Sequence, residues 1–163
     1  MVSKAELRQH RCCFTGHRPE KMVRSVKRIR ADLEIAIYKA MADGISVFIS
    51  GMARGVDIEA AEIVLQFRGA GLPIHLICAC PFPNCEKSWD YEWQKRYKTI
   101  MEAADFVRFI CPQYSRGCFQ LRNEWLINHS SRVIAVFNGL PGGTKNTIAY
   151  AARQGIPIYF MEG

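Results

Sequence analysis

The chain has 163 residues, of which 49% are hydrophobic and 23% are charged, and its formal net charge is +7 at pH 7. This composition is ordinary for a globular protein. It argues against a membrane-spanning protein, since no apolar run reaches the roughly 18 residues that a span needs. The length favours a single domain over residues 1–163. The charged start MVSKAELRQHR lacks the apolar centre of a secretory signal, so we expect a cytoplasmic protein with no membrane partner.

The seven cysteines predict free thiols. Their number is odd, and five lie within or at the ends of strand-like apolar runs: Cys12, Cys13, Cys78, Cys80 and Cys111. A free cysteine in such a run behaves as a small buried hydrophobe, and disulfides are rare in a reducing compartment. The C-x-C-x4-C spacing of Cys78, Cys80 and Cys85 has no matching second ligand pair, so we expect no metal site.

Strand-like and helix-like segments alternate along the chain. The predicted strands cover residues 10–16, 45–51, 72–80, 106–111, 132–139 and 157–161. The predicted helices cover residues 24–44, 56–71, 88–104, 119–130 and 144–155. In the first helix, apolar residues recur at steps of three or four positions, at Val26, Ile29, Leu33, Ile37 and Met41. This alternation predicts an α/β protein with a Rossmann-like, doubly wound, mainly parallel sheet of about six strands and helices on both faces.

Ligands of such folds bind at the carboxyl ends of the strands, so the loops after the strands matter most. The first unusual loop is TGHRPEKM, residues 15–22, which follows the first strand. Gly16 ends this strand, and His17 and Arg18 follow at the rim of the sheet. An arginine here can grip a phosphate or carboxylate with two parallel hydrogen bonds. A plain surface turn with solvated side chains explains the segment equally well.

The second loop is SGMARGVDIEAAE, residues 50–62, in which Gly51 and Gly55 precede a predicted helix. Glycines allow a ligand to approach the backbone closely, and the free N–H groups of a helix start attract anions. Asp57 falls in the first turn, where it could accept hydrogen bonds from ribose hydroxyls. The alternative is that the glycines only form a tight turn and that Asp57 favours the helix dipole.

The third loop is FNGLPGGTKNT, residues 137–147, between the strand RVIAVF and the helical pattern TIAYAA. Gly142 and Gly143 allow close approach to the backbone, and the Thr144 hydroxyl is suited to cap the helix. Asn146 lies in the first turn, near the positive end of the helix dipole. We expect this loop to form a donor-rich floor for a phosphate. We also expect the second and third loops to follow neighbouring strands and to hold the two ends of a nucleotide-like molecule.

A further segment, CFQLRNEWLINHSSR at residues 118–132, could close over the ligand. It carries Arg122, Asn123 and His129 on or near a helix. Arg122 and His129 are seven residues apart and therefore share a face. We expect His129 to be a structural residue, and we count Arg122 and Asn123 as candidate ligand contacts.

The motifs TGHRPEK, ISGMARGVDIEAAE, CFQLRNEWLINHSSRVIAVFNG and PGGTKNTIAYA occur in this order, and the chain resembles the YpsA-like branch of the SLOG superfamily. The resemblance runs from about residue 11 to 161. The superfamily also contains the DNA-processing protein A family and the "lonely guy" phosphoribohydrolases. It implies a Rossmann-like fold that binds nucleotides or nucleotide-derived ligands, often as a sensor. The ligand contacts that it implies are Gly16, His17, Arg18, Gly51, Gly55, Asp57, Gly142, Gly143 and Thr144.

The resemblance does not carry over a catalytic residue. The phosphoribohydrolase motif is P-G-G-x-G-T-x-x-E, whereas this chain reads PGGTKNTIAY. The glutamate position, three residues past Thr147, is occupied by Tyr150. A tyrosine, with a pKa near 10, is a poor substitute for a carboxylate. Glu62 or Glu124 could compensate, although no spacing in the sequence places either of them.

Three functions remain open. The first is binding of a nucleotide derivative such as ADP-ribose or NAD by a sensor without a firmly assigned cofactor. The second is hydrolysis of a nucleoside phosphate or N-glycosidic bond by Asp57 or Glu62. The third is binding of single-stranded nucleic acid, for which the basic segment 21–30 and the aromatic residues of segment 89–97 argue. In the third case, the plain alternative is that the basic residues form a solvated face and the aromatic residues a packed stripe.

Apolar surface on the helices also predicts a homodimer, which is the commonest oligomer.

Overall fold

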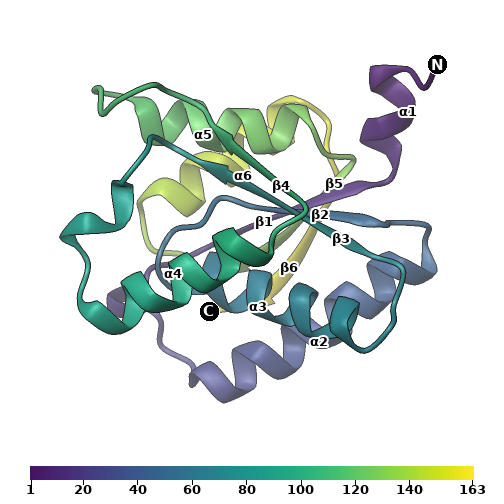
Figure 1. The fold of residues 1–163 in the computed structure, drawn as a ribbon. Helices are drawn as coiled ribbons and strands as arrows, with labels where there is room; N and C mark the ends of the chain where they lie inside the picture. The colour runs from purple at the N-terminus through teal and green to yellow at the C-terminus, as the bar shows by residue number, and fades with distance from the viewer.

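The computed structural model describes residues 1–163 and contains a six-stranded, all-parallel sheet with the strand order β4-β3-β2-β1-β5-β6 (Figure 1). The strands are β1 (Arg11–Gly16), β2 (Val47–Ser50), β3 (His75–Cys80), β4 (Phe106–Phe109), β5 (Arg132–Phe137) and β6 (Ile158–Glu162). Helices lie on both faces, so the prediction of a Rossmann-like, doubly wound α/β fold is confirmed.

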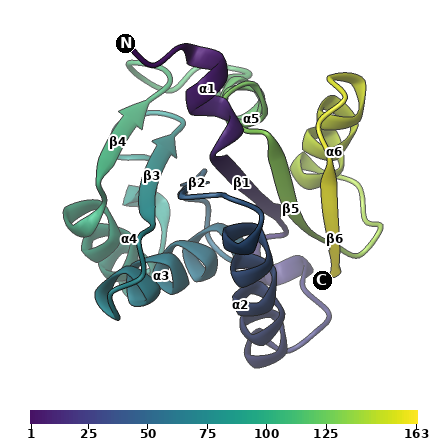
Figure 2. The same cartoon turned by 90° about the vertical axis from the view of Figure 1, so that its right-hand side faces the viewer.

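Two groups of helices cover opposite faces of the sheet (Figure 2). The first group is α2 (Val26–Ala42), α3 (Val56–Gly69) and α4 (Tyr91–Ala103). The second group is α5 (Cys118–Asn128) and α6 (Gly143–Arg153). Short 3₁₀ turns, η1 (Pro19–Lys21) and η2 (Cys85–Ser88), interrupt the loops after β1 and β3. No helix of the structure is both long and apolar enough to cross a membrane.

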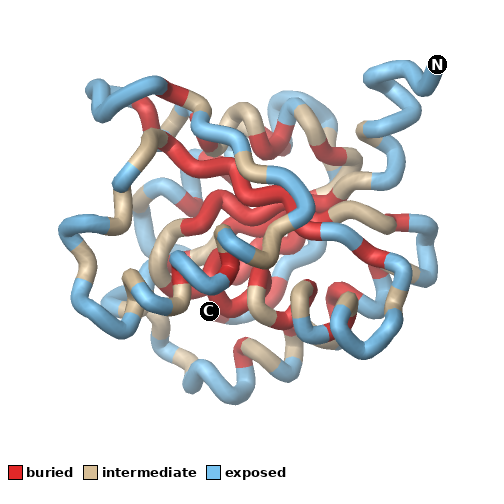
Figure 3. The backbone as a smooth tube through the Cα atoms, viewed as in Figure 1, coloured by how far each residue is buried: buried red, intermediate tan, exposed pale blue.

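The alternation of side chains along the strands divides the core into two layers. Successive strand residues point to opposite faces, so Cys12 and Phe14 pack beneath α2 and α3, whereas Cys13 packs beneath α5 and α6. The central strands are therefore buried along their length, and the exposed residues lie at the periphery (Figure 3). All seven cysteines are free, and six are buried.

The N-terminal segment and the first predicted helix differ from the sequence-based expectation. Residues Lys4–Gln9 form a short helix, α1, which begins with a reciprocal capping box between Ser3 and Glu6. None of its residues is buried, so no apolar periodicity marked it in the sequence. Val26, expected on the buried face of α2, is 43% exposed, because it lies in the first turn of the helix beyond the edge of the core.

The strand order places the switch point of the fold between β1 and β5. From β1 the chain moves outward through β2 to β4, and it then returns to the other side of β1 for β5 and β6. Loops that leave a sheet on opposite sides of such a point border a crevice. The expectation that the second and third loops follow neighbouring strands is wrong, since β1 lies between β2 and β5.

Candidate functional site

Two adjoining hollows form one cleft at the carboxyl ends of the strands. We call the first the inner hollow, with a volume of about 300 Å³, and the second the aromatic hollow, with a volume of about 420 Å³. They share four lining residues, Arg18, Ala53, Phe119 and Arg122. The remaining residues of the inner hollow are Thr15, Gly16, His17, Lys21, Asp57, Asn123, Gly143 and Thr144.

The start of α6 supplies free hydrogen-bond donors to the inner hollow. The helix begins at Gly143 and is preceded by Gly142, whose positive φ of 142° suits only glycine. The backbone N–H groups of Gly143, Thr144 and Lys145 donate to no acceptor in the protein. Thr144 is a residue of the first turn rather than the cap, so its predicted capping role is wrong. These donors and the helix dipole together favour an anion.

Asp57 places a buried carboxylate in the same hollow. Its side chain projects from the first turn of α3, and the residue is only 6% exposed. Its Oδ2 accepts a hydrogen bond of 3.2 Å from the Ala53 N–H, whereas its buried Oδ1 has no partner. Burial raises the pKa of Asp57 from 3.8 to about 6, although the charge of Arg122 and the Ala53 hydrogen bond act to lower it. The free Oδ1 is thus an acceptor for a donor group of a ligand.

Arg122 forms the wall between the two hollows. Its guanidinium is buried, donating from Nη1 to the Gly51 carbonyl and from Nε to the Asn123 Oδ1 at 2.8 Å. Burial lowers the pKa of Arg122, and the charge of Asp57 opposes this shift. Asn123 in turn leaves its amide nitrogen without a partner in the protein, 3.8 Å from where a side chain on Gly143 would begin.

The loop after β1 brings two cations and a neutral histidine to the inner hollow. Arg18 lines both hollows, and Lys21 is anchored by donating from Nζ to the Pro141 carbonyl at 3.0 Å. His17 is buried, and its Nε2 accepts a hydrogen bond of 3.2 Å from the Asn138 N–H. Burial and the nearby charge of Lys21 lower the pKa of His17, so the ring is neutral at pH 7.

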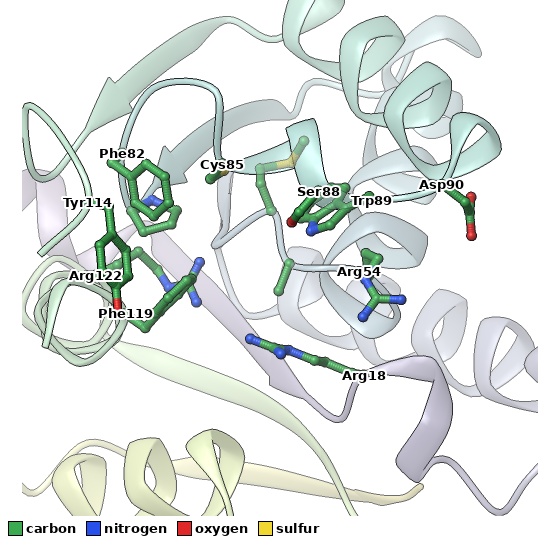
Figure 4. Close-up of a pocket in the computed structure, with 13 residues that line it drawn as sticks. Arg18, Arg54, Phe82, Cys85, Ser88, Trp89, Asp90, Tyr114, Phe119 and Arg122 are labelled. Carbon is green, nitrogen blue, oxygen red and sulfur yellow. The ribbon is translucent and has the colours of Figure 1, made fainter. Parts of the chain in front are cut away.

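Aromatic side chains border the second hollow. In Figure 4, Phe82, Tyr114 and Phe119 gather on one side of it and Trp89 lies on the other. The ring of Phe82 makes edge contacts with Tyr114 and Phe119, with centroids 5.6 and 6.0 Å apart. The guanidinium of Arg18 lies 6.0 Å from the Phe119 ring centroid. A flat, uncharged ring could therefore stack here beside cationic groups.

Three of the predicted glycine contacts have packing roles. A side chain on Gly55 would begin 2.6 Å from the His17 carbonyl oxygen, and φ at Gly55 is +95°, so this glycine lets the first loop lie against α3. A side chain on Gly16 would begin 2.4 Å from the Cβ of Val56, so this glycine lets β1 pack against α3, although it also lines the inner hollow. Gly51 supplies the carbonyl that holds Arg122. Gly51, Gly55 and Gly142 line neither hollow.

Several other candidates lie away from the cleft. Asn146 is exposed and lines neither hollow, because it projects from the outer side of the first turn of α6. Tyr150 donates its hydroxyl to Asn128 on α5, at 2.9 Å. Glu62 forms an ion pair with Arg96 on α4. His129 ends α5 at the opposite end of the sheet.

Two other loops contribute residues that were not predicted from the sequence. Phe82 follows β3 and Tyr114 follows β4, and the strand order brings both beside the inner hollow. The available signal was an aromatic residue just past the carboxyl end of a predicted strand. Phe119 lies three residues before Arg122, and this spacing alone predicts that the two residues lie on the same face of α5. The stripe of Trp89, Trp93 and Tyr97 packs against the core, as the plain alternative predicted.

The YpsA family model, described as the YspA SLOG family, matches residues 12–157. The chain belongs to this family. A UPF0398 protein, BH1768 of Halalkalibacterium halodurans, is 28% identical over 141 residues, which make up 85% of this chain and 68% of that one. The SPbeta prophage-derived protein YoqJ of Bacillus subtilis is 30% identical over 118 residues, covering 65% of this chain and 69% of YoqJ. The chain thus spans about two thirds of the length of each.

Two solved structures share the fold of this YpsA-family chain. DNA processing protein A from Helicobacter pylori superposes with a TM-score of 0.66 at 22% identity, covering 98% of this chain and 68% of that one. DNA processing protein A from Streptococcus pneumoniae superposes with a TM-score of 0.70 at 19% identity, covering 96% of this chain and 52% of that one. At such identities the likeness shows the common fold.

Proposed function

We propose that the cleft binds a nucleotide or nucleotide-derived ligand, such as ADP-ribose or NAD, and that the protein acts as a sensor. In this arrangement a phosphate lies against the free N–H groups of Gly143 and Thr144, near Arg18 and Lys21. A ribose hydroxyl donates to Asp57, and the base lies in the aromatic hollow. Membership of a SLOG family supports this proposal, because the SLOG superfamily includes proteins thought to bind nucleotides.

The observation that carries the proposal is the pairing of opposite polarities in one small hollow. The start of α6 offers donors without acceptors, and Asp57 Oδ1 offers a buried acceptor without a donor. A bare anion would satisfy the first and be repelled by the second. A phosphorylated sugar satisfies both, since its phosphate accepts and its hydroxyl donates.

Binding of single-stranded nucleic acid is the second candidate. The neighbouring protein from Helicobacter pylori has a described single-stranded DNA binding mode. In this chain, aromatic rings and three arginines, Arg18, Arg54 and Arg122, line the aromatic hollow, which is the combination that holds unstacked bases. A strand would enter the same cleft with one nucleotide in the place given above to the free ligand.

The cleft favours binding over hydrolysis. Asp57 is the one carboxylate that lines the inner hollow, and its raised pKa would suit an acid or base. A second carboxylate, as paired acid–base chemistry would need, is absent from that hollow, and Glu62 is held by Arg96 on the far side of α3. Asp90 lines the adjoining aromatic hollow, but it is exposed and caps α4 by accepting a hydrogen bond of 3.1 Å from the Trp93 N–H. Hydrolysis in the inner hollow would therefore rest on Asp57 alone. We also propose that the protein forms a homodimer, which analytical sedimentation of the full chain tests by measuring its molar mass in solution.

The test is a thermal-shift screen with AMP, ADP, ADP-ribose, NAD, cyclic dinucleotides and an oligothymidylate, followed by analysis of each mixture for breakdown products. A ligand of the folded state raises the melting temperature by mass action. A rise with an intact free nucleotide supports the sensor. A rise with the oligomer alone supports the second candidate, and released base or phosphate supports the hydrolase. No rise with any of them contradicts the proposal.

A further inference from the structure

A second groove lies at the other end of the sheet and shares no lining residue with the cleft. It has a volume of about 920 Å³ and runs between α1, the edge strand β4, the end of α5 and the turn before β6. In Figure 2, α1 stands at this end of the molecule and β4 forms one edge of the sheet. We call it the basic groove. Its volume is at the upper end of the range for ligand sites.

The groove exists because two helices cannot cover a six-stranded face. Phe106 and Arg108 of β4 are paired with Ile77 and Ala79 of β3, whose side chains pack beneath α5 and α6. By the alternation of the strand, Phe106 and Arg108 point to the same face. The helices leave both residues exposed, and Phe106 is 53% exposed. An exposed aromatic ring and an arginine therefore remain on an edge strand.

A stack of planar groups forms one wall. The rings of Trp125 and His129, one helical turn apart on α5, stack with centroids 3.9 Å apart and an interplanar angle of 17°. The His129 Nδ1 donates to the Trp125 carbonyl at 2.8 Å, which fixes the ring and leaves Nε2 as an acceptor. The Arg108 guanidinium lies 5.8 Å from the Trp125 ring centroid. The stack is thus held before any ligand arrives.

The charge of the groove is of one sign. Lys4, Arg8, Arg11 and Arg108 line it, and no aspartate or glutamate does. None of these four forms an ion pair with a carboxylate. Arg8 donates to the carbonyls of Ile127 and Ser130, so it offsets the negative end of the α5 dipole that faces the groove.

The basic segment 21–30 differs from the groove, because two of its five cations are already paired with carboxylates. Arg24 binds Asp32 at 2.7 Å, and Arg30 binds Glu59. The four cations of the basic groove have no such partners, and they lie in one groove together with aromatic rings. Charge and aromatic rings in one groove match the chemistry of an unstacked polynucleotide.

We propose that the basic groove binds a segment of single-stranded nucleic acid independently of the cleft. Lys4, Arg11 and Arg108 contact its phosphates, and a base lies against the exposed Phe106 ring beside the Trp125 stack. An acidic peptide would satisfy the charges as well, but it would make no use of the planar wall. This role is additional to ligand binding in the cleft and does not depend on it.

The test measures fluorescence anisotropy of labelled oligothymidylate and oligoadenylate with the full chain. The variants are Arg108→Glu and Phe106→Ala, and the charge-matched control is Lys27→Glu, an exposed cation on α2 without an ion pair. We expect Arg108→Glu to weaken binding about tenfold or more and to flatten its salt dependence. We expect Phe106→Ala to weaken it by about fivefold or more through lost stacking. Gly143→Asp, which alters only the cleft, should leave this binding in place.

Two results would overturn the proposal. One is equal binding by the wild type, Arg108→Glu and Phe106→Ala, which would place the oligomer elsewhere on the molecule, or an equal loss in Lys27→Glu, which would indicate non-specific attraction. The other is displacement of the oligomers by a polyglutamate peptide at lower concentration than by unlabelled oligomer, which would assign the groove to an acidic protein segment. Melting temperatures of all variants show whether any loss of binding comes from unfolding.

Discussion

Replacing Asp57 by asparagine should stabilise the unliganded protein at neutral pH while weakening ligand binding. The folded-state pKa of about 6 lies about two units above the ordinary value of 3.8. Protonated Asp57 therefore stabilises the fold below pH 3.8, and this contribution is lost as the pH rises through about 6. At 1.36 kcal/mol per unit, the loss amounts to about 3 kcal/mol at pH 7.

Asparagine carries no charge at any pH, so Asp57→Asn avoids this loss. We expect the difference in melting temperature between the variant and the wild type to grow from pH 4 to pH 7 and to reach about 6–12 °C. Differential scanning fluorimetry over this pH range measures it. The nucleotide affinity should fall by about 10- to 100-fold, the value of one hydrogen bond to a charged acceptor.

Asp105 offers a control variant, because its pKa is shifted in the opposite direction to that of Asp57. Burial acts to raise the pKa of Asp105, but hydrogen bonds from the Leu76 N–H and from Arg68 outweigh it and lower the pKa. Asp105→Asn should therefore lose stability relative to the wild type as the pH rises. A pH-independent difference for Asp57→Asn, or one that shrinks toward pH 7, would refute the account of a charge buried for the ligand.

Substitutions at three further positions test the site and its scaffold. Gly143→Asp adds a carboxylate where a side chain has room, so titration calorimetry should show lost nucleotide binding at an unchanged melting temperature, whereas Gly143→Ala should bind normally. Tyr114→Ala, at a residue 66% exposed, should weaken AMP binding by about 1–3 kcal/mol and leave ribose 5-phosphate binding unchanged. Gly16→Ala would meet Val56 at 2.4 Å and should lower the free energy of unfolding in urea by about 3 kcal/mol.

The sequence predicted the elements of the sheet well because each strand is a short, mostly apolar run, and β1, β2, β3 and β5 bury nearly all of theirs. Helix α1 has no buried residue, so no apolar periodicity in the sequence predicted it. The three glycine loops were recognised by composition, but composition could not separate a glycine that contacts a ligand from one that allows two loops to pack. Gly55 is the clearest case, since its role depends on the His17 carbonyl, which only the folded structure brings against it.

The aromatic hollow shows the same limit at the level of topology. Phe82 and Tyr114 belong to loops that follow different strands, and only the strand order brings their rings to 5.6 Å. Conversely, the seven-residue spacing of Arg122 and His129 predicts a shared helical face, yet Arg122 lines the cleft and His129 lines the groove at the opposite end of the sheet. The spacing of two residues along a helix predicts whether they lie on the same side of it, but not which site each of them borders.

The most direct test of the central claim is to locate the ligand by amide NMR of the ¹⁵N-labelled protein, titrated with ADP-ribose and with any nucleotide that raises the melting temperature. The account predicts that the largest shift changes occur at the amides of Gly143, Thr144 and Ala53, which border the inner hollow. Changes confined to the basic groove, or no saturable change with any of these nucleotides, would contradict it.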